Sequence, residues 1–318
     1  MRKTGKNSVQ KRFTQPQDWH WGMITNADQI DLRYGVLARH KNPVANIVIA
    51  PGLSEFGEKY FELARFLSRL NCNVHVLHWR GQGGSPSYLS DPFRRHSLGF
   101  DRDARDLLQF THEKVSGPAP KILLGHSMGG MISLLTLRHA PGVFKGAVLS
   151  APLLGFQQKL GRGLESILAT FPLPKSWLER YIPGGGPWMK RSDPTSPAKP
   201  NAFTSDPVRM HLHDYWMENK PSLRVGNPTL GFVQEASKSI LQLRSPGALE
   251  SITAPTLFFS GGDDRMVSSQ QIFNHVARLP NARHIHIPAA KHEILMEEDS
   301  IRRPVFKAIH NFIMANCP

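Results

Sequence analysis

The residues best suited to chemistry form the run Gly125-His126-Ser127-Met128-Gly129, in which a serine lies between two glycines. A strand-like apolar run, 121–124, leads into it, and a helical pattern follows over 128–139. A serine at such a junction occupies a sharp turn that lifts its hydroxyl above the sheet, and the glycines let the strand and helix backbones approach. The helix N-terminus offers free N–H groups to an oxyanion. The motif therefore predicts that Ser127 is a nucleophile.

The predicted general base lies in a loop near the end of the chain. A serine nucleophile needs a histidine to take its proton and a carboxylate to orient that histidine. At a strand–turn–helix site of this kind, the chain order is serine, then acid, then histidine. The loop Pro288-Ala289-Ala290-Lys291-His292-Glu293 follows the strand-like run 284–287. Of the 15 histidines, His292 has the required place and order.

The predicted acid lies in a glycine turn that follows the strand-like run 256–259. The turn Ser260-Gly261-Gly262-Asp263-Asp264 presents two adjacent carboxylates. Asp264 lies three residues before Val267, at the apolar start of the next helical segment, and we expect it to orient the histidine. Asp263 is expected to be an exposed or capping residue of the turn.

Acyl transfer also needs two N–H donors for the oxyanion. One follows the nucleophile, and the other is expected in a loop after an early strand. Residues 46–50 are strand-like, and Pro51-Gly52-Leu53-Ser54-Glu55 follows them. The backbone N–H groups of Leu53 and Met128 are therefore the predicted pair, and His126 is expected to pack within the turn. None of these steps needs a cofactor or a metal ion, so neither is expected.

Strand-like and helical segments alternate along most of the chain, which predicts an α/β protein with a mostly parallel, doubly wound sheet. The alternation stops between about residues 153 and 250, where proline and glycine are frequent. We therefore expect three parts: a basic N-terminal arm at 1–20, an α/β core at 21–152 and 251–318, and an inserted, mainly helical cap at 153–250.

The predicted cap holds many aromatic residues, for which two interpretations stay open. They could form the small core of the cap, or some could line a channel for an acyl chain, because a lipid tail needs apolar walls. The residues are Phe171, Trp177, Tyr181, Trp188, Phe203, Tyr215, Trp216 and Phe232.

The charge balance is strongly basic, with 39 Lys and Arg against 25 Asp and Glu, a formal net charge of +14. Such a surface favours anionic lipid headgroups or nucleic acid. The chain has no apolar run long enough to span a bilayer and no secretory signal pattern, and its two cysteines cannot form a disulfide framework. We expect a cytoplasmic protein, with peripheral contact at an anionic inner membrane surface.

Together, these motifs resemble the lysophospholipase and monoacylglycerol lipase branch of the α/β-hydrolases. The resemblance covers about residues 44–313, and two runs of the predicted cap are similar to those of bacterial lysophospholipases of the L2 type. It rests on the following runs: Pro51-Gly52-Leu53-Ser54-Glu55, Glu58-Lys59-Tyr60, Trp79-Arg80-Gly81-Gln82-Gly83, Gly125-His126-Ser127-Met128-Gly129-Gly130, Asn201-Ala202-Phe203-Thr204-Ser205-Asp206, Val225-Gly226-Asn227-Pro228-Thr229 and His292-Glu293-Ile294-Leu295-Met296-Glu297. Pro51 departs from the family pattern, in which a histidine often precedes the glycine and braces the oxyanion loop.

The resemblance implies a triad of Ser127, Asp264 and His292 that hydrolyses the ester of a single-chain lipid, foremost a lysophospholipid. Three alternatives stay open: a monoacylglycerol lipase or general carboxylesterase, an acyltransferase that passes the acyl group to a lysolipid, and a catalytically silent basic binding protein. The expected partner is a lipid or ester substrate, and no nucleic acid is expected. The sequence leaves the oligomeric state open.

Overall fold

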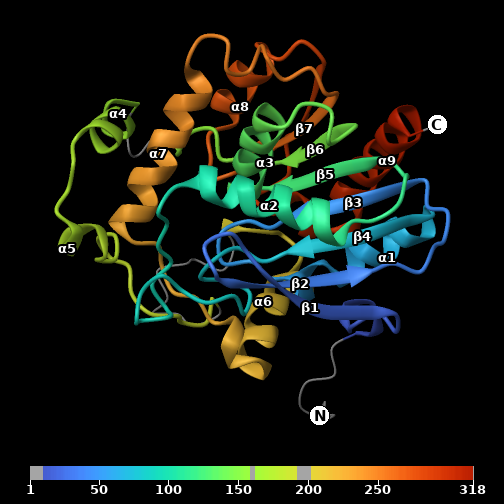
Figure 1. The fold of residues 1–318 in the computed structure, drawn as a ribbon, viewed down its shortest axis with the longest axis horizontal. Helices are drawn as coiled ribbons and strands as arrows, with labels where there is room; N and C mark the ends of the chain where they lie inside the picture. Colours follow the sequence, from blue (N-terminus) through green and yellow to red (C-terminus); the bar gives the residue numbers. More distant parts are fainter. Residues whose placement is uncertain (1–9, 158–161, 192–201, 318) are drawn as a thin grey trace.

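A single sheet organises the protein, as the computed structural model shows for residues 10–157, 162–191 and 202–317 (Figure 1). Its strands run in the order β1-β2-β4-β3-β5-β6-β7-β8. Neighbouring strands from β4 and β3 through to β8 pair in parallel. The strands are β1 (Trp19–Thr25), β2 (Asp31–Leu37), β3 (Ala45–Ala50), β4 (Cys72–Leu77), β5 (Lys121–His126), β6 (Gly146–Ser150), β7 (Thr256–Gly261) and β8 (Ala282–Ile287). The predicted α/β fold with a mostly parallel sheet is confirmed.

Helices cover both faces of this sheet. In Figure 1, α2 and α3 lie in front of the central strands, and α9 passes behind them. The helices are α1 (Phe61–Arg69), α2 (Phe100–Lys114), α3 (Met128–His139), α4 (Arg162–Thr170), α5 (Lys175–Leu178), α6 (Pro207–Asn219), α7 (Leu230–Arg244), α8 (Ser269–Val276) and α9 (Asp299–Asn316). This double cover explains why the central strands are apolar throughout: every residue of β3, β4, β6 and β7 is buried.

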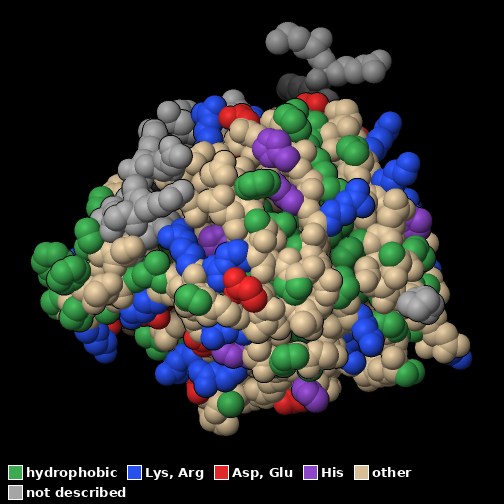
Figure 2. All heavy atoms as spheres, turned by 90° about the horizontal axis from the view of Figure 1, so that it is seen from above, with side chains coloured by type: hydrophobic (Ala, Val, Ile, Leu, Met, Phe, Trp, Pro, Cys, Tyr) green, Lys and Arg blue, Asp and Glu red, His purple; other side chains and the backbone are tan. Residues whose placement is uncertain are grey.

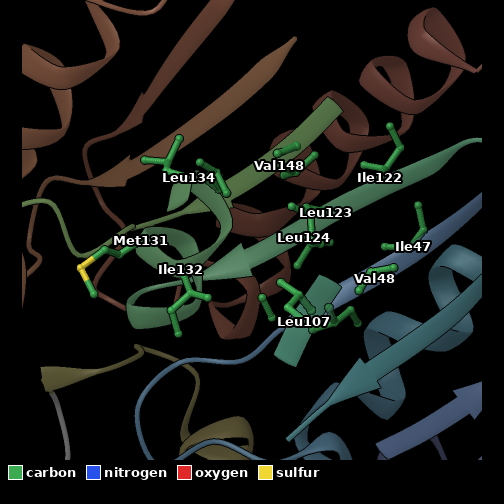
Figure 3. Packing of buried hydrophobic residues seen from close by; sticks show 14 of the residues in the cluster. Ile47, Val48, Leu107, Ile122, Leu123, Leu124, Met131, Ile132, Leu134 and Val148 are labelled. Carbon is green, nitrogen blue, oxygen red and sulfur yellow. The ribbon is translucent and has the colours of Figure 1, made fainter. Parts of the chain in front are cut away.

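The core lies where the central strands meet α2 and α3. Figure 3 shows Val48 of β3 and Leu123 of β5 beside Leu107 of α2 and Ile132 of α3. All four side chains are fully buried. Burial of this kind contributes roughly 25 cal/mol per Å² of apolar surface, so it holds the carboxyl ends of β3 and β5 in a fixed relation.

A long excursion separates β6 from β7. It contains α4 to α7, and α4 and α5 project to one side of the sheet (Figure 1). Helix α7 packs against α2 and α3, and its residues Phe232, Ala236 and Ile240 belong to the main core. The excursion is therefore anchored on the core through α7. The predicted cap boundaries at 153 and 250 stay a prediction, and residues 158–161 and 192–201 lie outside the described part.

The first two strands were missed by sequence analysis. β1 and β2 form an antiparallel hairpin, and β2 continues the sheet by pairing antiparallel with β4. Residues 1–9 of the predicted basic arm lie outside the described part. Further along the predicted arm, Phe13 is buried, and Arg12 forms an ion pair with Glu62 of α1.

Candidate active site

Ser127 lies in a strained turn between β5 and α3. Its backbone has φ 52° and ψ −118°, a left-handed value of φ that a non-glycine residue rarely adopts. The turn is held because the N–H of Ser127 donates to the carbonyl of Ser150, and the carbonyl of Ser127 accepts from Leu153 and from the first turn of α3. The serine is thereby fixed at the carboxyl edge of the sheet.

The two glycines of the motif are required by close backbone approach. A Cβ on Gly129 would lie 2.0 Å from the carbonyl oxygen of Ala50, at the end of β3. A Cβ on Gly125 would lie 2.6 Å from the hydroxyl of Ser133 in α3. Neither side chain could be accommodated, which is the reason the motif places glycine at these two positions.

The three predicted triad residues lie in hydrogen-bond contact. His292 Nε2 is 2.9 Å from Ser127 Oγ, and His292 Nδ1 is 2.8 Å from Asp264 Oδ2. All three side chains are almost fully buried. The acid and the histidine come from the loops that follow β7 and β8, so the parallel strands bring together residues that are 165 positions apart in the sequence.

Asp264 is held in the orientation that a triad acid needs. Its Oδ1 accepts the N–H groups of Met266 and Val267 at 2.8 and 3.0 Å, which leaves Oδ2 for the histidine. Burial opposes ionisation of this carboxyl, but the charge and hydrogen bond of His292 outweigh burial and lower the pKa of Asp264. The neighbouring Asp263 is partly exposed and pairs with Arg265. The two adjacent acids therefore have distinct environments.

Two backbone N–H groups, one in the loop after β3 and one directly after the serine, have no acceptor in the described part of the chain. Among the residues that the structure describes, none accepts a hydrogen bond from the N–H of Leu53 or of Met128. Met128 is the first residue of α3, whose N–H has no partner within the helix. These are the donors that the sequence predicts for the oxyanion.

The loop that carries Leu53 is held by hydrogen bonds to most of its remaining backbone N–H and carbonyl groups. Trp79 Nε1 donates to the carbonyl of Pro51, and Gln82 Nε2 donates to the carbonyls of Gly52 and Glu55. The N–H of Ser54 donates to Gln82 Oε1. These bonds explain how the loop is braced in a chain that has a proline at position 51.

The Glu55 carboxylate completes this bracing. Its Oε2 accepts the N–H of Gly52 at 2.5 Å and the hydroxyl of Tyr60 at 2.5 Å, and it lies 3.0 Å from His126 Nδ1. Its Oε1 lies 2.6 Å from Lys59 Nζ. Burial opposes ionisation, but the charges of His126 and Lys59 hold the Glu55 pKa well below its usual range.

The same lysine links this cluster to the histidine loop. Lys59 Nζ lies 2.7 Å from Glu293 Oε1, and Glu293 also pairs with Arg191 at 3.0 Å, a residue between β6 and β7. Burial disfavours the Glu293 carboxylate, yet the two cations lower the pKa of Glu293 strongly. Sequence analysis missed the roles of Glu55, Lys59 and Glu293. The signals available were their places in the runs that carry the family resemblance and the i, i+4 spacing of Glu55 and Lys59.

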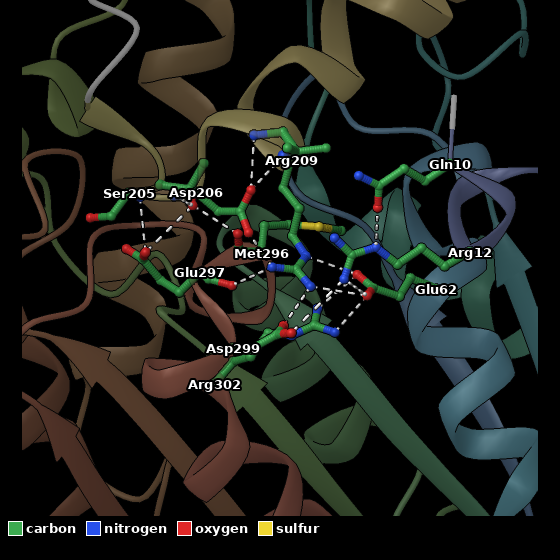
Figure 4. A network of polar contacts seen from close by, with 12 residues as sticks. Gln10, Arg12, Glu62, Ser205, Asp206, Arg209, Met296, Glu297, Asp299 and Arg302 are labelled. Carbon is green, nitrogen blue, oxygen red and sulfur yellow. Dashed lines mark hydrogen bonds and ion pairs between the residues drawn. The ribbon is translucent and has the colours of Figure 1, made fainter. Parts of the chain in front are cut away.

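A second ionic network holds α6 against the core (Figure 4). Arg209 of α6 bonds to Glu62 of α1 and to Asp299 of α9, and Arg302 of α9 also bonds to Glu62. Arg209 is fully buried, and its bonds to these acids outweigh burial and raise its pKa. The network thereby connects α6 to α1 and α9, outside the site.

The aromatic residues of the predicted cap are found in several environments. Phe232 belongs to the main core, and Trp188 and Trp216 pack against a second small cluster of Phe56, Met217 and Leu223. Phe171 and Trp177 are exposed. The proposed acyl-chain channel stays a prediction. In the described ranges, no group of three or more His, Cys, Asp and Glu side chains could hold a metal ion.

This fold is that of an α/β-hydrolase. Residues 41–299 match the family described as serine aminopeptidase, S33, and the chain belongs to that family. It is 32% identical to lysophospholipase L2 of Escherichia coli (strain K12) over 302 residues, which cover 91% of this chain and 86% of the relative. It is 38% identical to monoglyceride lipase of Rattus norvegicus over 237 residues, covering 72% and 68% of the two chains. The predicted resemblance is confirmed.

Solved structures agree on the fold. A soluble variant of monoglyceride lipase from Saccharomyces cerevisiae superposes with a TM-score of 0.73 at 17% identity and covers 96% of this chain and 99% of that chain. The monoacylglycerol lipase of Paleococcus ferrophilus gives a TM-score of 0.67 at 19% identity, with 90% and 99% of the two chains covered.

The adjacent acids provide a matched test of the triad. Asp264→Asn removes the carboxylate that bonds His292 and should lower kcat/KM for a p-nitrophenyl ester by roughly 10⁴-fold, as loss of this carboxylate does in other triads. Asp263→Asn removes the same charge one residue away and should leave the rate within a few fold of the unmodified protein. Equal losses in the two variants would contradict the assignment of the acid.

Proposed function

We propose that the protein hydrolyses the carboxylic ester of a single-chain lipid, a lysophospholipid, with Ser127 as nucleophile. The observation that carries the proposal is the continuous contact from Ser127 through His292 to Asp264, beside two free N–H groups. The similarity to lysophospholipase L2 over 91% of the chain supports the choice of substrate class. A basic protein with a net charge of +14 also suits a substrate that carries a phosphate.

The geometry supports a two-step reaction. His292 Nε2 takes the proton of Ser127 as Oγ attacks the acyl carbonyl carbon, and the N–H groups of Leu53 and Met128 bind the oxygen that becomes negative. Asp264 stabilises the imidazolium. The imidazolium then returns the proton to the departing glycerol oxygen, which leaves an acyl-serine. Water attacks this ester with His292 as base, and the fatty acid and free Ser127 are released.

The alternatives differ in acceptor and headgroup. A monoacylglycerol lipase or general carboxylesterase would use the same residues on a neutral substrate, and an acyltransferase would replace water with a lysolipid. The chain is similar to both lysophospholipases and monoglyceride lipases, so the monoacylglycerol lipase remains an alternative. A silent binding protein would have no reason to keep two unpaired N–H groups beside a strained serine.

A turnover panel tests this function. Lysophospholipids, monoacylglycerols and short esters of matched acyl length are each compared with the Ser127→Ala protein as the blank. We expect the highest kcat/KM on a lysophospholipid, free fatty acid as product even with added acceptor lysolipid, and loss of turnover in the variant. Undiminished turnover by Ser127→Ala would refute the role of Ser127 as nucleophile. A preference for the monoacylglycerol would refute the lysophospholipid as the substrate.

We also propose that the α4–α5 side of the molecule contacts an anionic lipid surface. Ile167, Phe171 and Trp177 are exposed by 51%, 63% and 51%. Lys175 beside them is exposed by 91%, and Arg180 stacks over the Trp177 ring. Apolar side chains with flanking cations suit the boundary between headgroups and acyl chains.

Figure 2 shows hydrophobic side chains gathered at the edge of the molecule where Figure 1 places α4 and α5, with Lys and Arg beside them. In the described part of the chain, no helix combines the length and apolarity needed to cross a bilayer. The contact we propose is therefore peripheral, and the predicted cytoplasmic location at an inner membrane stays a prediction.

Vesicle sedimentation tests this surface. The double variant Phe171→Ser, Trp177→Ser should bind anionic vesicles several-fold more weakly at low salt, because it loses the apolar side chains that enter the lipid boundary. Phe273→Ser is the matched control, since Phe273 is 57% exposed on α8, outside this surface. The proposal fails if the double variant binds like the control, or if the unmodified protein binds neutral and anionic vesicles equally at low salt.

A further inference from the structure

His126 lies at the end of β5, directly before the nucleophile, and is buried between two loops of the site. Its Nδ1 is 3.0 Å from Glu55 Oε2, in the oxyanion loop. Its Nε2 is 3.2 Å from the carbonyl oxygen of His292. One ring thus connects the loop that carries Leu53 to the loop that carries the general base.

Both of these partners are acceptors. The carbonyl oxygen of His292 has no proton to give, and Glu55 is held as a carboxylate because its Oε2 already accepts from Gly52 and Tyr60. A neutral imidazole has one N–H and one lone pair, so it can satisfy only one of the two oxygens. The imidazolium has an N–H on each nitrogen and satisfies both.

We propose that His126 works as a buried imidazolium that positions the catalytic machinery, with Nδ1–H donated to Glu55 and Nε2–H to the carbonyl of His292. It is a positioning residue, because it acts through the oxyanion loop and the base and touches no reacting atom. The inference deepens the proposed function and rests on the roles given there to Leu53 and His292.

The acidic neighbours of the ring, Glu55 and Glu293, favour this state, and the nearby Lys59 ammonium opposes it. Glu55 faces the ring from the oxyanion loop, and Lys59 faces it from the 3₁₀ turn Gly57–Tyr60. From the histidine loop, Glu293 and the His292 ring face it, and the centroids of the His126 and His292 rings are 4.9 Å apart. Burial lowers the His126 pKa, but the charge and hydrogen bond of Glu55 outweigh burial, and the net pKa lies above its usual value.

A defined pH dependence follows. Because the folded-state pKa is raised, the added stability is fully present below the unfolded-state pKa of about 6.5 and is lost as the pH rises through the folded-state value. Above that value the ring is neutral, and one of its nitrogens presents a lone pair to an oxygen of Glu55 or His292 instead of donating a proton to it. The oxyanion loop and the histidine loop then lose one of the hydrogen bonds that connect them. Turnover should therefore fall on the alkaline side.

The protonation state can be read directly by ¹⁵N NMR of the histidine rings, with His126→Gln used to assign the signals. At pH 7.5, where an unperturbed histidine is neutral, we expect both His126 nitrogens to carry a proton. A ring with one unprotonated nitrogen at this pH would overturn the proposal. This readout needs no turnover, so it stays decisive if the proposed function fails.

Kinetics provide the second measurement. His126→Gln cannot titrate, so its kcat should lose the alkaline fall and be lower by about 10²-fold, the loss that a displacement of about 1 Å in a catalytic group produces. KM should change less. His75→Gln is the matched control, a buried histidine on β4 that bonds Asn46 outside the site, and should keep the pH profile of the unmodified protein. A lower kcat with an unchanged alkaline fall would show a structural role only and would overturn the proposal.

Discussion

The carboxylate of Glu55 is the interaction on which the rest of the site depends. It lies under the oxyanion loop and holds four groups: the N–H of Gly52, the hydroxyl of Tyr60, the ring of His126 and the ammonium of Lys59. An oxyanion donor contributes only if it is aimed before the charge develops, because reorienting it during the reaction would cost free energy. By fixing Gly52, Glu55 fixes the adjacent peptide, whose N–H belongs to Leu53. The N–H that we propose as an oxyanion donor thus depends on a buried negative charge.

Buried charges are expensive unless each has a partner, and the pairs here also connect distant parts of the chain. Arg191 pairs with Glu293, Glu293 with Lys59, and Lys59 with Glu55. These three ion pairs connect the excursion between β6 and β7 to the histidine loop, and the histidine loop to the oxyanion loop. Removing one member would take a partner from each of its buried neighbours, so the three segments are stabilised together.

The sequence predicted the parts of the site that follow from local pattern and chain order. Ser127 was recognisable from its strand–glycine–helix context, and His292 from its place after the last strand. The hairpin β1–β2 was missed because its strands are only partly buried and their alternation is weak. The role of Glu55 could not be predicted either. Four contacts from residues near and far in the chain define it, and no pattern within one segment encodes them.

The most direct measurement is the rate at which a fluorophosphonate labels Ser127 in Glu55→Gln, since that attack uses the same N–H donors as an ester. Glu62→Gln is the matched control, because it also loses a carboxylate from an ionic network, one that holds α6 rather than the oxyanion loop. If Glu55 positions the donors, labelling slows by about 10²-fold in Glu55→Gln and stays near the unmodified rate in Glu62→Gln. Equal labelling rates in a folded Glu55→Gln protein and in the unmodified protein would contradict the account.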